Sequence, residues 1–116
     1  MSGLGFSYQV VKIAAGDLGA PATKKYDIEV WLPSEQRYRE LTSCSNYRDY
    51  SARRLQTRAA LEGGSGLDLV HTLNGTACAV CRTLVNLFEY CQQPDGSFVV
   101  PEVLRAYVGT DVIPAR

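Results

Sequence analysis

The segment from position 80 to position 91 repeats apolar residues at the spacing of one helix face. Six residues carry the repeat, at offsets of 0, 3, 4, 7, 8 and 11: Val80, Thr83, Leu84, Leu87, Phe88 and Cys91. Residues at these offsets line one side of an α-helix, and such a stripe is stable when another surface covers it. The segment therefore predicts an amphipathic helix that packs against something flat.

Alternating residues earlier in the chain predict that flat surface. Four apolar residues of the segment 26–33 fall on one strand face: Tyr26, Ile28, Val30 and Leu32. The opposite face carries two acids and an aromatic residue: Asp27, Glu29 and Trp31. Because successive side chains of a strand point to opposite faces, the segment predicts a strand with one dry face and one polar face.

A turn at residues 33–36 leads into a predicted hairpin partner at residues 38–45. Glu40 and Thr42 fall on one face of this partner strand, and Leu41 and Ser43 fall on the other. Further strands are predicted at residues 8–14 and 69–75, each bounded by segments rich in Gly or Pro. The strands together predict an antiparallel or mixed sheet.

Residues 46–58 predict a short helix with a basic surface. Asn46 is suited to the N-cap, and Asp49 suits the positive end of the helix dipole. Four arginines lie in this segment: Arg48, Arg53, Arg54 and Arg58. A solvated charged face is the simpler interpretation of these arginines, and a surface that binds a polyanion is the alternative. A last helix is predicted with Pro101 at its first position.

Length and composition limit the kinds of protein that this chain can form. Its 116 residues are enough for one domain, which we expect to span residues 1–116. Twelve basic and twelve acidic side chains cancel, so no global charge attracts the chain to nucleic acid. No apolar run approaches the roughly 20 residues that cross a bilayer, so we expect no membrane partner and a cytoplasmic location.

The stretch HTLNGTACAVCRT, residues 71–83, holds several candidate chemical groups. Cys78 and Cys81 form a single C-x-x-C, with Cys44, Cys91 and His71 as the other candidate metal ligands. A closed zinc site needs four ligands, usually as two such pairs, so no zinc is expected. A redox pair requires an accessible, electropositive thiol, and a disulfide requires an oxidising compartment. Small buried side chains are the simpler interpretation of these cysteines.

Arg82 is the stronger candidate for chemistry in this stretch. It lies about 200° around the helix from Val80, at 100° per residue, so it falls outside the predicted buried stripe. A solvated surface arginine is the simpler interpretation. The preceding strand, however, delivers Asn74 and Thr76 just before the helix begins. An arginine in that position can clamp a phosphate through its planar fork.

Three blocks of the chain resemble the seryl-tRNA synthetases, a family of class II aminoacyl-tRNA synthetases, in their bacterial and mitochondrial branch. The blocks are YDIEVWLPSEQRYRELTSCSNYRDYSARR, LNGTACAVCRT and QQPDGSFVVPEVLRAYVG. The resemblance runs from about residue 3 to residue 111, which corresponds to the C-terminal half of the catalytic domain. It implies an α+β fold in which an antiparallel sheet is flanked by helices, and a ligase that activates serine with ATP and transfers it to tRNA(Ser).

The resemblance also assigns expected roles to residues of this chain. The stretch of Glu40, Leu41, Thr42 and Ser43 is expected to contribute to the ATP and magnesium site, with Glu40 as the Mg²⁺ ligand. Arg82 is expected to contact the γ-phosphate. Asn74 and Thr76 are expected to bind serine. The implied cofactors are ATP and Mg²⁺, and the implied partners are serine, ATP and tRNA(Ser).

Relative to this family, the chain is expected to lack the coiled-coil arm and the first two signature motifs, which leaves three hypotheses. The chain is a truncated synthetase, inactive alone; or one subunit of a split enzyme; or a non-catalytic module that binds a nucleotide or tRNA. Removal of half a domain should also expose a sheet edge and the dry strand face, so we expect marginal stability or self-association. A longer precursor would allow a mitochondrial location.

Overall fold

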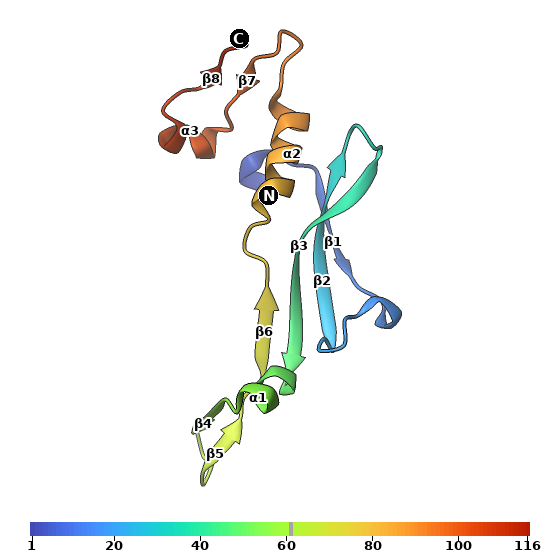
Figure 1. Ribbon diagram of the computed structural model, residues 1–116, viewed down its shortest axis with the longest axis vertical. Helices are drawn as coiled ribbons and strands as arrows, with labels where there is room; N and C mark the ends of the chain where they lie inside the picture. Colours follow the sequence, from blue (N-terminus) through green and yellow to red (C-terminus); the bar gives the residue numbers. More distant parts are fainter. Residues whose placement is uncertain (61) are drawn as a thin grey trace. The chain divides into compact units, whose positions relative to one another are not determined.

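The computed structural model describes residues 1–60 and 62–116 (Figure 1). Its largest sheet has four strands in the order β1-β2-β3-β6. The bounds are β1 Tyr8–Lys12, β2 Lys24–Leu32, β3 Arg37–Arg48 and β6 Thr72–Gly75. Two-stranded sheets are formed by β4 Arg58–Ala60 with β5 Leu67–Leu69, and by β7 Phe98–Val99 with β8 Val112–Ile113.

The helices complete the predicted α+β fold. They are α1 Tyr50–Leu55, α2 Val80–Cys91 and α3 Glu102–Val108, with 3-10 turns η1 Ser2–Leu4 and η2 Ala15–Asp17. Strand β3 pairs with β6, β4 with β5, and β7 with β8, and each of these pairs is antiparallel. The expectation of antiparallel pairing is therefore confirmed. No helix of the described residues is long and apolar enough to cross a membrane.

The chain divides into two compact units. The first unit contains Met1–Gln9, Ile28–Leu41 and Cys78–Arg116, and the second contains Val10–Asp27 and Thr42–Ala77. Strands β2 and β3 contribute residues to both. The expectation of a single domain over residues 1–116 remains a prediction.

An apolar core lies in the first unit. Its buried centre consists of Phe6, Val30, Leu41 and Leu87, which come from the N-terminal segment, β2, β3 and α2. Val30 is fully buried, and Leu41 is 2% exposed. Helix α2 thus covers part of the dry face predicted for β2. Burial of these apolar side chains stabilises the fold by about 25 cal/mol for each Å² of apolar surface removed from water.

The second unit buries mostly polar side chains. Its buried residues, within the described part of the chain, are Asp27, Thr42, Ser45 and Ala52. Large apolar residues of the same unit are exposed, among them Val10, Leu55, Leu67 and Leu73. Since apolar burial is the main favourable term in folding, the second unit has little of its own to stabilise it.

The alternation predicted for β2 is wrong at its N-terminal end. Asp27, expected on the polar face, is 5% exposed, whereas Tyr26, expected on the dry face, is 39% exposed. Lys25 lies 3.0 Å from the Asp27 carboxylate and pairs with it. This ion pair makes burial of the carboxylate tolerable, because a buried charge needs a partner.

The helix predicted over residues 46–58 is shorter than expected. Asn46 remains in β3, opposite Leu73 of β6, and Asp49 is the N-cap of α1. The Asn46 side chain accepts a hydrogen bond from the Arg48 backbone instead of capping a helix. Arg48 has a positive φ of 44° where the register shifts, so a bulge turns the chain between strand and helix. Arg58 lies in β4.

The single strand predicted over residues 69–75 is two strands. Strand β5 ends at Leu69, β6 begins at Thr72, and Val70 and His71 lie between them. Pro101 is the N-cap of α3 rather than its first residue, and Gly109 ends that helix with a φ of 79° and a backbone hydrogen bond to Arg105. The pairing of β8 with β7 was not predicted from the sequence.

Helix α2 has the predicted bounds, but it buries a different arc. Leu87 and Asn86 are buried, and Thr83 and Tyr90 are half-buried. Three members of the predicted stripe are exposed instead: Val80, Leu84 and Phe88. At 100° per residue, the buried arc is rotated by roughly 80° from the stripe that the sequence predicts.

We expect the two units to differ in local stability. Amide hydrogens in the first unit, such as those of Val30 and Leu41, should exchange more slowly than those of β6 in the second unit. The physical reason is the small number of buried apolar side chains in the second unit. Native-state hydrogen exchange followed by NMR measures this, and equal protection of both sets of amides would contradict it.

We expect Leu41→Ala to reduce the free energy of unfolding by about 2–5 kcal/mol, since it removes buried methyl groups and leaves a cavity. Leu67→Ala is the matched control, because Leu67 is 63% exposed. Its substitution should change stability by no more than about 0.5 kcal/mol. Urea denaturation followed by circular dichroism measures both, and an equal loss for the two variants would contradict this account of the core.

Candidate functional site

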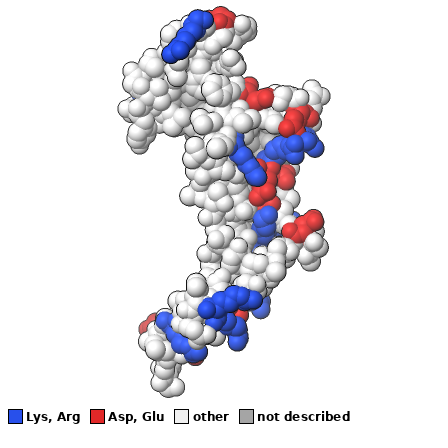
Figure 2. All heavy atoms as spheres, in the orientation of Figure 1, with Lys and Arg blue, Asp and Glu red and all other residues white. Residues whose placement is uncertain are grey.

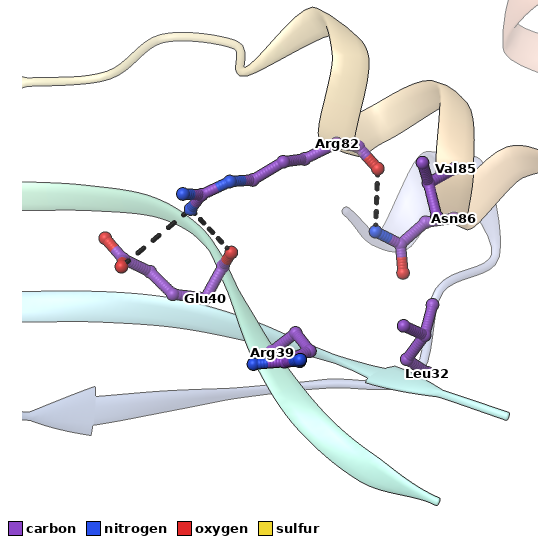
Figure 3. Close-up of a pocket in the computed structure, with 6 residues that line it drawn as sticks. All are labelled: Leu32, Arg39, Glu40, Arg82, Val85 and Asn86. Carbon is purple, nitrogen blue, oxygen red and sulfur yellow. Dashed lines mark hydrogen bonds and ion pairs between the residues drawn. The ribbon is translucent and has the colours of Figure 1, made fainter. Parts of the chain in front are cut away.

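Arg82 and Glu40 meet in the first unit (Figure 3). Nη1 of Arg82 donates a hydrogen bond to the backbone oxygen of Glu40 at 3.0 Å. The same nitrogen lies 3.8 Å from Oε2 of the Glu40 carboxylate. Both side chains are largely solvent-accessible, with exposures of 61% and 40%. The structure therefore brings together Arg82, which is expected to contact the γ-phosphate, and Glu40, which is expected to bind Mg²⁺.

Helix α2 places Arg82 over β3 through contacts along its length. Leu87 packs into the core beside Leu41, the residue after Glu40. The Tyr90 hydroxyl donates to the backbone oxygen of Trp31 in β2 at 2.8 Å. The Glu89 carboxylate accepts a hydrogen bond from the Ser34 backbone at the hairpin turn at 3.0 Å. These contacts tie α2 to the hairpin of β2 and β3, so the start of the helix is held above Glu40.

A cavity of about 310 Å³ opens beside this pair. Its lining residues are Leu32, Arg39, Glu40, Arg82, Val85 and Asn86 (Figure 3). Two guanidinium groups, one carboxylate and one amide face two apolar side chains across this space. The volume is at the lower end of that of small-molecule sites, and the mixture of one apolar wall with convergent polar groups is typical of them.

Asn86 is a site residue that sequence reasoning missed. It is 5% exposed, and its Nδ2 donates to the backbone oxygen of Arg82 at 2.9 Å. Its Oδ1 is buried and has no hydrogen-bond partner among the described residues. A polar residue four positions after Arg82, inside an otherwise apolar helix segment, is the signal that could have found it, because residues i and i+4 share a helix face.

Arg39, another lining residue, is held by an acidic side chain at the hairpin turn. The Glu35 carboxylate accepts hydrogen bonds from Arg37 at 2.7 Å and from Arg39 at 2.8 Å. The Arg37 hydrogen bond, with that of Arg39 and the charges of both, holds the pKa of Glu35 below its usual value, although partial desolvation opposes this. The pair of arginines is therefore anchored at the edge of the cavity.

The remaining predicted site residues are divided between the units. Leu41 is buried in the core of the first unit, so its side chain packs and does not face solvent. In the second unit, Thr42 is buried, and the backbone oxygen of Ser43 accepts a hydrogen bond from the Thr76 backbone at 3.0 Å. Asn74 pairs with Ser45 across β3 and β6. Ser43 and Thr76 are thus brought together, and the ligand roles of all these residues remain predictions.

The cysteines show no metal cluster in the described part of the chain. Cys44, Cys78 and Cys81 are exposed free thiols, and Cys91 is half-buried. Their expected role as small buried side chains is therefore wrong for the first three. Burial raises the pKa of the Cys91 thiol. Residues 1–60 and 62–116 contain no group of three or more His, Cys, Asp or Glu side chains that could hold a metal.

Two of the arginines of the second unit, Arg53 and Arg54, have local partners. Arg53 pairs with Asp49 at 2.6 Å, and the guanidinium of Arg54 lies 3.6 Å from the ring centre of Tyr50. Figure 2 shows much of the visible face without charge, positive and negative side chains close together along its right-hand edge, and mainly positive ones over the segment labelled α1 in Figure 1. Pairing of this kind favours the interpretation of a solvated charged surface.

Comparison with known proteins assigns the chain to a family. Residues 1–90 match the tRNA synthetase class II core domain (G, H, P, S and T). The chain belongs to this family. The chain is 54% identical over 110 residues to the serine–tRNA ligase of Thermodesulfovibrio yellowstonii. It is 56% identical over 113 residues to that of Caldanaerobacter subterraneus subsp. tengcongensis. The class II core is thus homologous to serine–tRNA ligases.

Solved structures carry the same class II core. Seryl-tRNA synthetase from Pyrococcus horikoshii complexed with ATP matches 99% of this chain, with a TM-score of 0.90 and 42% identity. The cytoplasmic serine–tRNA ligase from Naegleria fowleri in complex with AMP matches 99% of it, with a TM-score of 0.87 and 43% identity. The predicted resemblance and the α+β fold are therefore confirmed.

The chain spans about a quarter of the length of the curated relatives it matches. The match covers 95% of this chain and 26% of the Thermodesulfovibrio protein, and 97% and 27% for the Caldanaerobacter protein. The solved chains give the same proportions, at 26% and 27%. The comparisons therefore show the family of this chain but not the activity of a whole synthetase.

The lowered pKa of Glu35 predicts a loss of stability in acid. A carboxylate with a lower pKa in the folded state than the usual 4.5 stabilises the fold above that value, and the contribution is lost as pH falls through the lowered pKa. We expect a side-chain carbon NMR titration of Glu35 to show a midpoint below 4.5. Arg37→Ala should move the midpoint upward, and an unchanged midpoint in that variant would contradict the assigned cause.

Proposed function

We propose that this chain contributes the phosphate-binding side of an ATP site and takes part in the activation of serine for transfer to tRNA(Ser). The observation that carries the proposal is the placement of the Arg82 guanidinium over Glu40, at the edge of a cavity in a class II synthetase core. The matched Pyrococcus structure, a seryl-tRNA synthetase complexed with ATP, supports the choice of nucleotide.

The chemistry of serine activation explains why such groups are needed. A serine carboxylate oxygen attacks the α-phosphorus of ATP, the bond from that phosphorus to the bridging oxygen breaks, and pyrophosphate leaves. Negative charge builds on the departing phosphates, so fixed cations close to them lower the barrier. The planar fork of Arg82 can donate two parallel hydrogen bonds to phosphate oxygens, and we assign it the γ-phosphate.

The Arg82–Glu40 contact is weak enough to be replaced when a ligand arrives. An exposed ion pair contributes at most about 1 kcal/mol, and the carboxylate of this pair is 3.8 Å away. In our proposal the triphosphate takes the guanidinium, and Mg²⁺ takes the Glu40 carboxylate. The accessible carboxylate oxygens of Glu40 fit this ion, because Mg²⁺ is usually bound through one or two carboxylates together with phosphate and water oxygens.

The second unit would supply the serine site and the rest of the stretch that begins at Glu40. We assign Thr76 and Asn74 to serine, because a hydroxyl or amide that is left unpaired when alanine binds gives strong discrimination against it. The Ser43–Thr76 backbone hydrogen bond holds the two stretches together at this point. Thr42 is buried, so its contribution would come from shaping this strand rather than from direct contact.

Complete activity in this proposal requires the rest of the synthetase fold. The chain matches about a quarter of its relatives, and the α-phosphate needs electrostatic stabilisation beyond that of one arginine. We therefore propose that the chain works together with the rest of a synthetase catalytic domain. A module that binds a nucleotide or tRNA without catalysis is the alternative, and exchange of labelled pyrophosphate into ATP separates the two.

Binding of ATP with Mg²⁺ tests the proposed site directly. We expect Arg82→Ala to weaken ATP binding by about 10- to 100-fold, because hydrogen bonds to charged groups contribute about 1.5–3 kcal/mol. Arg53→Ala is the matched control, since Arg53 is an exposed arginine of the second unit that pairs with Asp49. Isothermal titration calorimetry on the full chain measures both. Equal affinity in the two variants would remove Arg82 from the site.

Exchange of labelled pyrophosphate into ATP then tests catalysis. Exchange that needs serine and is lost in Arg82→Ala would identify an enzyme. ATP binding without exchange, in the chain alone and with the complementary part of a synthetase added, would favour the binding module. A steep loss of tRNA binding with rising salt would support a tRNA-binding role, because phosphate contacts release counterions.

A further inference from the structure

One face of helix α2 is apolar and exposed. Val80, Leu84 and Phe88 lie along it at intervals of four residues, with exposures of 62%, 48% and 55%. We call these three residues the α2 ridge. The neighbouring arc of the helix, roughly 90° around at 100° per residue, carries Leu87 and Tyr90, which pack on the core. An apolar arc this wide is typical of a helix that protein covers on more than one side.

The α2 ridge borders an apolar cavity of about 370 Å³ in the first unit. Leu84 and Phe88 of the ridge line it, together with residues from β7, α3 and β8: Phe98, Leu104 and Ile113. Its lining contains no charged side chain. Phe88 and Phe98 stack edge to face at 5.5 Å, so the ridge and the cavity form one continuous surface. Exposed apolar surfaces of this kind mark interaction sites.

The sequence pattern and the structure disagree about this face, and the disagreement is informative. The repeat from Val80 to Cys91 predicts that the ridge is buried, but the core of this chain takes another arc of the helix. The relatives show where a cover can come from. Part of the Pyrococcus synthetase has a fold similar to that of this chain, with a TM-score of 0.90. This part is 26% of the Pyrococcus chain. The other three quarters are available there to cover faces that are exposed here.

We propose that the α2 ridge and the adjoining cavity are the docking surface for the part of a class II synthetase that lies outside the matched quarter. The inference rests on the proposed function, which it deepens by naming the surface on which the rest of the synthetase fold packs. The segment that docks must present a row of apolar side chains and no buried charge, since none of the residues that line the cavity has a charged or polar side chain to pair with one.

Co-expression tests this docking surface. The partner is the Thermodesulfovibrio serine–tRNA ligase with the 110 matched residues removed, and the probe is a tag on the full-length 116-residue chain. We expect the partner to co-purify with the wild-type chain. Leu84→Glu and Phe88→Glu should each weaken the association at least tenfold, measured by titration of the purified parts. Leu67→Glu is the control, because Leu67 is also an exposed apolar residue, at 63%, but lies in the second unit.

Each outcome of this experiment bears on the proposal. Equal association of the ridge variants and the wild type, or no association of any version, would overturn it. Concentration-dependent dimers of the chain alone that Phe88→Glu dissolves would also overturn it, and would identify a second copy as the occupant. Circular dichroism melts show whether the variants remain folded, and a folded variant with lost association supports the docking surface.

ATP binding by the same proteins separates this inference from the proposed function. The ridge residues do not line the cavity beside Arg82, so the ridge variants should bind ATP as the wild type does. If the wild-type chain binds ATP but does not associate with the partner, the proposed docking surface is wrong and the proposed nucleotide site still stands. Specific docking by a chain that binds no ATP would support the docking surface and sink the assignment of the nucleotide site.

Discussion

The packing of α2 on the hairpin of β2 and β3 is the constraint on which the first unit depends. Leu87 fills the core between Val30 and Leu41, and the Tyr90 hydroxyl fixes the helix to the backbone of β2. Leu87 anchors the helix by apolar burial, and Tyr90 anchors it by a directional hydrogen bond. Together they fix how closely α2 packs on the strands and how it is rotated about its own axis. The position of Arg82 above Glu40 follows from this packing, because the arginine lies in the same helix, about one and a half turns before Leu87 and about two turns before Tyr90.

The distribution of buried residues between the two units has a functional meaning. The first unit has an apolar core and holds the Arg82–Glu40 pair, whereas the second buries Asp27, Thr42 and Ser45 around one alanine. A site that exchanges ligands needs groups that can change partners, and exposed pairs of the Arg82 kind can do so at small cost. The α2 ridge matches the sequence pattern of a buried face, but its three side chains are each about half exposed.

Much of the fold could be predicted, and the errors have physical causes. The bounds of α2 followed from its repeat, but the arc it buries did not, because periodicity says which residues share a face and not what covers them. The β3 strand ran past Asn46, since pairing with β6 outweighed the capping preference of that residue. Asp27 was placed on the wrong face, because its burial depends on the neighbouring Lys25 rather than on its own polarity.

The family, the helix α2 and the separate candidate residues Arg82 and Glu40 could be predicted from the sequence, because these depend on residue types, on local spacing and on blocks that resemble a known family. Only the tertiary structure decided that Asn86 closes the cavity, that Leu41 belongs to the core, and that the ridge of Val80, Leu84 and Phe88 is left uncovered. Those facts depend on how a helix is rotated on a sheet. Rotation is set by the summed packing of residues far apart in the chain, which no local pattern encodes.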